Sequence, residues 1–143
     1  MVIWSRSFTL DQLTAVCRGT AAQHCGVRIT AFGDGWLEGT VPLDSRTEGP
    51  AGTLHPGALA ILAETLGSLA AYLCIDTSRQ ICVGQVIEVN HPEPIRSGPV
   101  RARVSALAIL GSRQIWNVEM TDALGAKVCF ARLTMAILEA SPA

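Results

Sequence analysis

Residues 56–75, PGALAILAETLGSLAAYLCI, decide the fold of this chain. Their length is close to the roughly 20 residues of a membrane span, but Glu64 stands in the middle and no Trp, Lys or Arg anchor adjoins either end. Pro56 suits the first turn of a helix. The segment therefore predicts a core helix from Pro56 to Ile75, about 30 Å long. Because this helix is apolar on nearly all sides, it requires a sheet that curls around it.

Strand-like segments lie on both sides of this helix in the sequence. Thr9 and Gln12 form the pattern of a capping box, which predicts a short helix from Leu10 to Arg18. Apolar and β-branched patterning predicts strands at 27–32, 36–43, 81–90, 100–107, 113–122 and 127–138, with a loop over 44–54. This order predicts an α+β fold, a curved antiparallel β-sheet wrapped around one long central α-helix. Residues 1–143 contain no repeat or linker, so we expect a single domain.

The composition narrows the classes of partner. Hydrophobic residues make up 49% of the chain and charged residues 16%, whereas roughly 25% charged residues is usual in soluble domains. The apolar surplus favours an oligomer over a monomer. The net charge is −1 and no basic block occurs, so the sequence favours neither a nucleic acid nor a membrane surface as partner.

The cysteines bear on the cellular compartment. The chain has five of them, with no CxxC pair, and most lie in apolar runs, where a free cysteine acts as a small hydrophobe. A disulfide framework or a metal site is therefore not expected. The N-terminus lacks the layout of a signal peptide, and together these features predict a cytoplasmic protein.

Glu64 is the first candidate for chemistry, because it is the only formally charged residue between Glu48 and Asp76. A carboxylate on an apolar helix is unfavourable to bury without a partner. It either points to solvent, pairs with an arginine, or is retained at a cleft as a base or nucleophile. Ser68 lies one turn further along the same face and Gly57 two turns back. Ser68 either supports Glu64 or is a small packing residue.

The sequence His55-Pro56-Gly57 marks the start of the helix. Proline favours the first helical position and keeps His55 extended, in the conformation of a cap. We expect the N–H groups of Gly57 and Ala58 to be free and to point outward with the positive end of the helix dipole. Such amides can stabilise a developing oxyanion. The alternative is that His55 is simply a capping residue.

These motifs together resemble a known family. The segment LHPGALAILAETLGSLAAYLCI is similar to the catalytic-helix motif of hotdog-fold acyl-CoA thioesterases, which has His-Gly-Gly-Ala, a later Glu and then Gly-Ser. The segments VPLDSRTEGPAGTLH, VGQVIEVNH, LGSRQIWNVEM and ARLTMAIL also match. The resemblance is strongest to small bacterial aryl-CoA thioesterases, including those that hydrolyse dihydroxynaphthoyl-CoA or proofread aryl-carrier proteins in siderophore synthesis. It implies a hotdog fold and sites formed at the subunit boundaries of a homodimer or homotetramer.

The resemblance also implies a reaction and roles for individual residues. The reaction is hydrolysis of an acyl or aryl thioester of coenzyme A or of a carrier protein, with no metal and no cofactor, because coenzyme A is part of the substrate. Glu64 corresponds to the catalytic carboxylate, and Ser68 supports it. His55 orients the thioester carbonyl. The other implied substrate contacts are Asn90 and His91 at the aryl end and Arg96 and Arg113 at the coenzyme A phosphates, although both arginines can equally be simple surface residues.

Two positions depart from the family pattern. Gly49 stands where the family commonly has Gln, and Pro56 replaces the glycine whose N–H usually binds the oxyanion. Proline has no N–H, so Gly57 would have to supply the donor. The departures leave a second function open: a thioesterase-like protein without hydrolysis that binds an acyl or aromatic ligand. Such a protein could instead catalyse a proton transfer such as isomerisation, cyclisation or dehydration.

Overall fold

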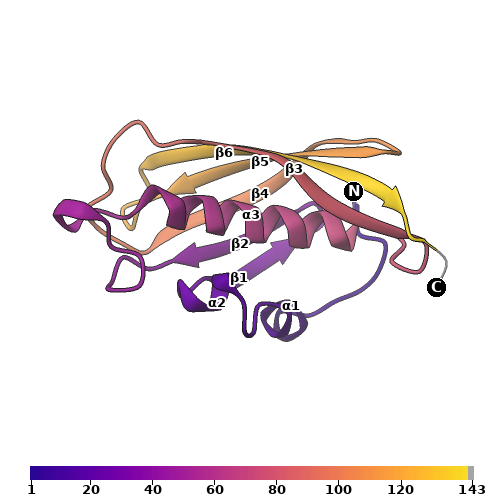
Figure 1. The fold of residues 1–143 in the computed structure, drawn as a ribbon, viewed down its shortest axis with the longest axis horizontal. Coiled ribbons are helices and arrows are strands. Elements are labelled where there is room, and N and C mark those ends of the chain that lie inside the picture. The colour runs from indigo at the N-terminus through magenta and orange to yellow at the C-terminus, as the bar shows by residue number, and fades with distance from the viewer. Residues whose placement is uncertain (142–143) are drawn as a thin grey trace.

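The computed structural model describes residues 1–141 and shows one curved sheet with one long helix (Figure 1). The elements in chain order are α1 (Leu10–Val16), α2 (Ala21–His24), β1 (Arg28–Gly33), β2 (Trp36–Val41), the 3₁₀ turn η1 (Pro50–Gly52), α3 (Pro56–Leu73), β3 (Gln80–Asn90), β4 (Val100–Ile109), β5 (Arg113–Thr121) and β6 (Lys127–Glu139). The six strands form one sheet in the order β1-β2-β4-β5-β6-β3, and every neighbouring pair is antiparallel.

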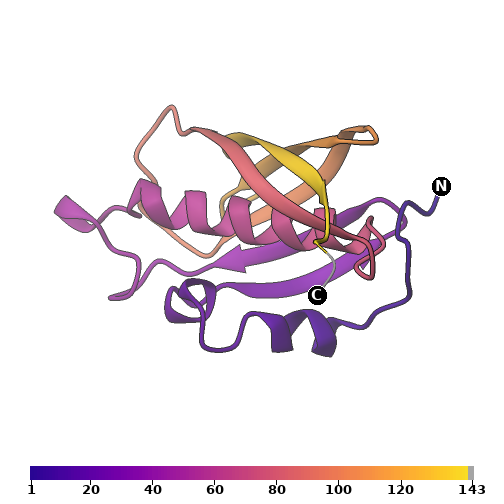
Figure 2. The ribbon, with the colours of Figure 1, turned by 45° about the vertical axis from the view of Figure 1, so that its right-hand side comes forward.

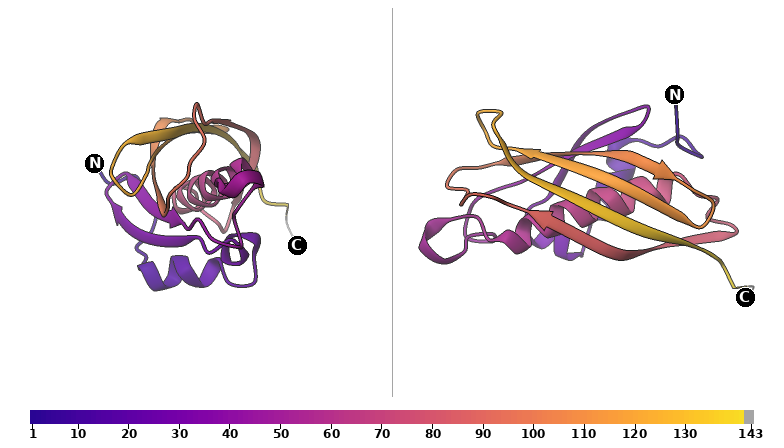
Figure 3. Two further views of the ribbon diagram at one scale, coloured as in Figure 1. Left: turned by 90° about the vertical axis from the view of Figure 1, so that its left-hand side faces the viewer. Right: turned by 90° about the horizontal axis from the view of Figure 1, so that it is seen from above.

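The sheet curves around α3, as the view along the helix shows (Figure 3, left). Leu59, Leu62 and Leu66 of α3 are buried, and inward-facing residues of the strands cover them, including Leu37, Val104, Trp116, Met120 and Leu133. The predicted fold, an antiparallel sheet wrapped around one central helix, is confirmed. α3 is long and apolar enough to cross a membrane, but here it is the buried core helix.

Gly67 allows α3 to lie close to the sheet. A Cβ atom at this position would lie 2.7 Å from Cδ2 of Leu133 on β6, which is closer than side-chain atoms approach one another. The helix therefore packs directly on the middle of β6, at Leu133. The neighbouring Ser68 lies about 100° further around the helix and is half-buried.

The N-terminal part differs in detail from the prediction. The capping box of α1 is confirmed, since Thr9 Oγ1 accepts from the Gln12 N–H and Gln12 Oε1 accepts from the Thr9 N–H. The helix ends earlier, at Val16, and the sequence analysis did not predict α2 or η1. Both are too short to show a helical period in the sequence. In Figure 2, α1 and α2 lie below the β1–β2 hairpin; α1 packs against β1, and α2 also contacts α3.

β3 forms one edge of the sheet, because within the described residues it pairs only with β6. Edge strands normally carry charges or turn away from solvent to avoid pairing with another chain. β3 instead exposes apolar side chains, among them Ile81, Val83 and Val86, with exposed fractions of 47%, 45% and 59%. This strand leaves an unpaired, apolar edge on the single chain.

Candidate active site

Glu64 and Ser68 form a direct pair on α3. Ser68 Oγ donates a hydrogen bond of 2.6 Å to Oε1 of Glu64, and both side chains are half-buried. They belong to a stripe with Ala60 and Tyr72, spaced by four residues, in which no residue is fully buried. The expectation that Glu64 and Ser68 share one face is confirmed. Within residues 1–141, no arginine or lysine forms a salt bridge with Glu64.

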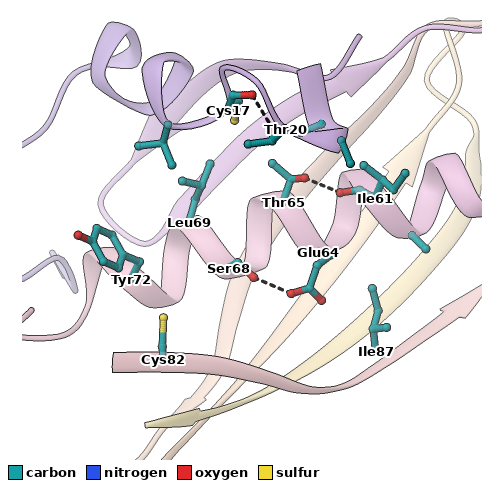
Figure 4. A pocket seen from close by; sticks show the side chains of 14 residues that line it. Cys17, Thr20, Ile61, Glu64, Thr65, Ser68, Leu69, Tyr72, Cys82 and Ile87 are labelled. Carbon is teal, nitrogen blue, oxygen red and sulfur yellow. Dashed lines mark hydrogen bonds between the residues drawn. The ribbon is translucent and has the colours of Figure 1, made fainter. Parts of the chain in front are cut away.

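A cavity of about 720 Å³ opens beside this stripe, and we call it the Glu64 pocket (Figure 4). Its walls come from three parts of the chain, the α1–α2 region (Val16, Cys17, Thr20, Ala21, Ala22), α3 (Ala60, Ile61, Glu64, Thr65, Ser68, Leu69, Tyr72) and β3 (Cys82, Ile87). Glu64 is the only acidic or basic side chain among them. The sequence analysis did not identify the walls from α1–α2 and β3, because their apolar residues look like ordinary core.

Gly84 of β3 lies directly against Glu64. A Cβ atom at position 84 would lie 2.9 Å from Oε1 of Glu64, a distance that real Cβ atoms essentially never show. The strand register also shifts between Gly84 and Val86. The sequence analysis missed this residue, although a lone glycine inside a strand pattern is the usual sign of a bulge or of a close approach. Gly84 leaves room for the carboxylate.

The N-terminus of α3 corrects one expectation. His55 Nδ1 accepts a hydrogen bond of 2.9 Å from the Gly57 N–H, and the His55 carbonyl accepts one of 2.9 Å from the Ala58 N–H. The amides of Gly57 and Ala58 are therefore engaged rather than free, because His55 acts as the helix cap. Since Nδ1 is an acceptor, the proton of the neutral imidazole is on Nε2. The exposed His55 ring presents that single N–H donor outward.

The loop before α3 fixes the position of His55. The His55 N–H donates to the carbonyl oxygen of Thr47 at 2.8 Å, and Thr47 is itself buried. Gly49 lies against the histidine, because a Cβ atom there would be 3.3 Å from the His55 Cα. The backbone of His55 is thus held between the loop and the first turn of α3.

The two groups on α3 are far apart within one chain. Nine residues separate His55 from Glu64, and a rise of about 1.5 Å per residue places them about 14 Å apart along the axis. This distance is too long for both side chains to contact one thioester group. The structure therefore brings Glu64 together with Ser68, and His55 with Gly57, but does not join the two pairs.

The remaining candidates lie away from the Glu64 pocket. Asn90 is the last residue of β3, and its side-chain amide donates to the Glu88 carboxylate. His91 follows in a loop and is exposed to solvent. Both are six or seven residues beyond Gly84, roughly 20 Å along an extended strand. Arg96 is exposed in the loop before β4. Arg113 is exposed at the start of β5, and because its neighbour Gln114 is buried, it points to the outer face of the sheet.

The cysteine thiols of the pocket are held in the neutral form. Burial raises the pKa of Cys17 and of Cys82 above the ordinary thiol value, and it raises the pKa of the nearby Cys74 to about 12. All five cysteines are free. Within residues 1–141, no three His, Cys, Asp or Glu side chains gather in the manner of a metal site.

Comparison with known proteins gives matches along nearly the whole chain. The profile of the thioesterase superfamily matches residues 51–129, which include α3 and β3. The 1,4-dihydroxy-2-naphthoyl-CoA hydrolase of Escherichia coli is 41% identical over 137 residues, 96% of this chain and 100% of the relative. The proofreading thioesterase EntH of Cronobacter sakazakii is 42% identical over 139 residues, with 96% and 99% covered.

A solved structure shows the same arrangement. The crystal structure of a mutant of the thioesterase PA1618 from Pseudomonas aeruginosa superposes with a TM-score of 0.93 at 40% sequence identity, covering 96% of this chain and 99% of that one. The whole described architecture, from the N-terminal helices to β6, therefore has a counterpart of known fold.

Proposed function

Because the chain belongs to the thioesterase superfamily, we propose that it hydrolyses an acyl or aryl thioester of coenzyme A or of a carrier protein. Water and the thioester give a carboxylic acid and a free thiol. The observation that carries the proposal is the carboxylate of Glu64, held by Ser68 at the wall of an otherwise uncharged pocket. The names of the relatives from Escherichia coli and Cronobacter sakazakii support the same class of substrate.

Glu64 acts either as the general base or as the nucleophile. Its Oε1 atom is engaged by Ser68, so Oε2 is the atom that meets the substrate. As a general base, it takes a proton from the water that attacks the thioester carbon. As a nucleophile, it attacks the thioester carbon and the C–S bond breaks with release of the thiolate, which leaves a mixed anhydride that water then cleaves. Ser68 holds the carboxylate in one orientation in either route.

His55 supplies a donor to the carbonyl oxygen. Pro56 has no N–H, and the Gly57 N–H is engaged by His55 Nδ1, so the outward Nε2–H is the donor presented at the helix start. A rotation of the imidazole would release Gly57 as a second donor. Such donors are worth about 3 kcal/mol to the transition state.

A second subunit completes the site. Since His55 and Glu64 of one chain cannot reach one thioester, we place the helix N-terminus of one subunit opposite Glu64 of another. The apolar edge of β3 supports this arrangement, because it lies beside the Glu64 pocket and is open to pairing. The assembly is a homodimer, or a tetramer built from two dimers.

The four candidate residues outside the Glu64 pocket contact the parts of the substrate beyond the thioester group. Asn90 and His91 line the aryl end in the assembled site, and Arg96 and Arg113 bind the phosphates of coenzyme A. No further cofactor is required, because coenzyme A is part of the substrate. We place the protein in the cytoplasm, where such thioesters are formed.

Substitution of the carboxylate tests the proposal. Glu64→Gln keeps the size of the side chain and removes its basic oxygen, so thiol release from benzoyl-CoA and hexanoyl-CoA should fall by at least about 100-fold. Circular dichroism should show an unchanged fold. Glu93→Gln, at an exposed loop position, is the control. Full turnover in the Glu64→Gln protein would refute the role of Glu64.

A second candidate is a thioesterase-like protein without hydrolysis. The observation in its favour is the start of α3, where Pro56 lacks an N–H and the amides of Gly57 and Ala58 are engaged. Such a protein would bind an acyl or aromatic ligand or use Glu64 for a proton transfer. Binding of a thioester by the unmodified protein, with no thiol release from any aromatic or aliphatic substrate, would favour this candidate.

A further inference from the structure

We propose that the buried hydroxyl of Thr47 positions His55 for the reaction, by fixing the loop that leads from β2 to α3. The inference rests on the proposed function, because it concerns the aim of the Nε2–H donor that the proposal assigns to His55. Thr47 is buried and does not contact the substrate, so it is a positioning residue rather than a catalytic one. Its effect passes through the backbone of the loop.

Thr47 stands out by its burial. Within residues 1–141, only two of the polar and charged residues are buried, Thr47 and Gln114, with exposed fractions of 3% and 2%. Gln114 accepts from the indole N–H of Trp116 in the core, whereas Thr47 lies in the loop between β2 and α3. Its neighbours Arg46 and Glu48 are exposed. A hydroxyl removed from water at such a place is unfavourable unless its hydrogen bonds are made.

The hydroxyl of Thr47 connects the loop to the end of the sheet. Its Oγ1 atom donates to the carbonyl oxygen of Pro42 at 2.6 Å and accepts from the N–H of Asp44 at 3.2 Å. The Thr47 N–H also donates to the Asp44 carbonyl oxygen at 3.0 Å. Pro42 directly follows Val41, the fully buried last residue of β2. The hydroxyl therefore holds the loop against the end of a buried strand.

The carbonyl group of Thr47 holds His55, since its oxygen accepts from the His55 N–H at 2.8 Å. Next to this hydrogen bond, Glu48 and Leu54 form an antiparallel bridge, and we call this pairing of two chain segments the loop neck. Leu54 is buried, and its N–H donates to the Ile95 carbonyl oxygen at 2.8 Å. Because Thr47 forms one side of the neck, a shift of Thr47 displaces His55 on the other side.

The His55 side chain depends on these backbone contacts for its direction, because it is exposed and packing does little to hold it. The His55 carbonyl oxygen accepts from the Ala58 N–H and its Nδ1 from the Gly57 N–H, both at 2.9 Å. With its N–H bound to Thr47, the Nε2–H is the one polar group of His55 left for the substrate. Such a donor must be held within about 0.5 Å of its productive position, and Thr47 ties His55 to the sheet.

Removal of the hydroxyl tests the inference. Thr47→Val keeps the branched shape but leaves two backbone groups without their partner. We expect kcat for thiol release from benzoyl-CoA to fall by about 10- to 100-fold with KM unchanged, because His55 loses its aim while the Glu64 pocket does not change. Thr47→Ala also lacks the hydroxyl and should give a similar loss. Thr47→Ser keeps the hydroxyl and should keep kcat.

Thr53→Val is the matched control, because the Thr53 hydroxyl donates to a backbone carbonyl of the same loop beyond the neck. This variant should keep kcat. A combination with His55→Ala then separates positioning from general support of the fold. Since Thr47 acts through His55, adding Thr47→Val to His55→Ala should lower kcat by less than about twofold. An equal loss in both backgrounds would overturn the inference.

Amide hydrogen exchange tests the loop without hydrolysis. The His55 N–H should exchange at least about 10-fold faster in Thr47→Val than in the unmodified protein, whereas Thr47→Ser and Thr53→Val should show little change. Unchanged exchange in Thr47→Val, or faster exchange with full kcat, would overturn the inference. Absence of thiol release from the unmodified protein would count against hydrolysis alone, because the exchange rate still reports whether Thr47 holds His55.

Discussion

Gly84 is the residue whose role was least visible in the sequence, and the structure makes it testable. In Gly84→Ala, the new methyl group would overlap Oε1 of Glu64, so the carboxylate must move and its hydrogen bond with Ser68 must lengthen. Displacements of about 1 Å in a catalytic group lower rates by up to 10²-fold. We therefore expect kcat for thiol release to fall by about 10- to 100-fold, with little change in KM.

The control for this prediction is Gly111→Ala. Gly111 lies in an exposed bend where a Cβ atom meets nothing within 4 Å, so kcat should be unchanged. Glu64→Asp shortens the carboxylate and makes room for the methyl group. The double variant of Gly84 and Glu64 should therefore lose less activity than the product of the two single losses. Strictly multiplicative losses would mean that Gly84 does not act through Glu64.

The residues of the site differ in how far the sequence could predict them. The spacing of four between Glu64 and Ser68 was sufficient, because residues so spaced always share a helix face. The cap at His55 could also be predicted, because a proline at the first helical position keeps the residue before it extended. That His55 Nδ1 would engage the Gly57 amide could not be read from spacing, because it depends on the rotamer of the imidazole.

At the scale of elements, long periodic segments were predicted best. α3 and the four C-terminal strands lie within two residues of their expected positions, because their patterns extend over many residues. α2 and η1 were missed, since a four-residue helix and a 3₁₀ turn are fixed by tertiary contacts rather than by a period. The walls of the Glu64 pocket that come from the α1–α2 region were missed for the same reason.

The edge strand β3 gives a prediction about assembly. Val83→Lys places a charge on the exposed edge, which prevents pairing with another strand, so light scattering should show a lower mass than for the unmodified oligomer. Thiol release should fall with the mass, because the site needs a second subunit. Leu107→Lys, at an exposed position of the interior strand β4, is the control and should leave the mass unchanged. A monomeric unmodified protein that is fully active would contradict the shared site.

At the scale of the whole molecule, the fold follows from one physical requirement. An apolar helix with a single carboxylate must be enclosed, and a sheet of six antiparallel strands is wide enough to curve around it. The enclosure is incomplete along the stripe of Ala60, Glu64, Ser68 and Tyr72, and the pocket lies there. The position of this opening depends on how the N-terminal helices pack, which no local pattern specifies.

The burial of two cysteine thiols, Cys74 and Cys129, predicts how the stability of the whole molecule depends on pH. Burial raises the pKa of Cys74 to about 12 and that of Cys129 to about 11, from an ordinary value of 9.0. Between pH 9 and these values, the unfolded chain loses thiol protons that the folded protein keeps. The contribution to stability is therefore complete below pH 9 and is lost as the pH rises through 11 and 12.

Urea unfolding under reducing conditions measures this dependence. From pH 8 to pH 10.5, the free energy of unfolding should fall by about 1–2 kcal/mol for each of the two thiols. Cys129 is buried in the core, so the Cys129→Ala protein should be less stable at pH 8. Its free energy of unfolding should, however, fall less steeply as the pH rises. Val118→Ala, a core substitution that removes no thiol, should keep the full slope. An equal slope in Cys129→Ala and in the unmodified protein would mean that another group causes the alkaline loss.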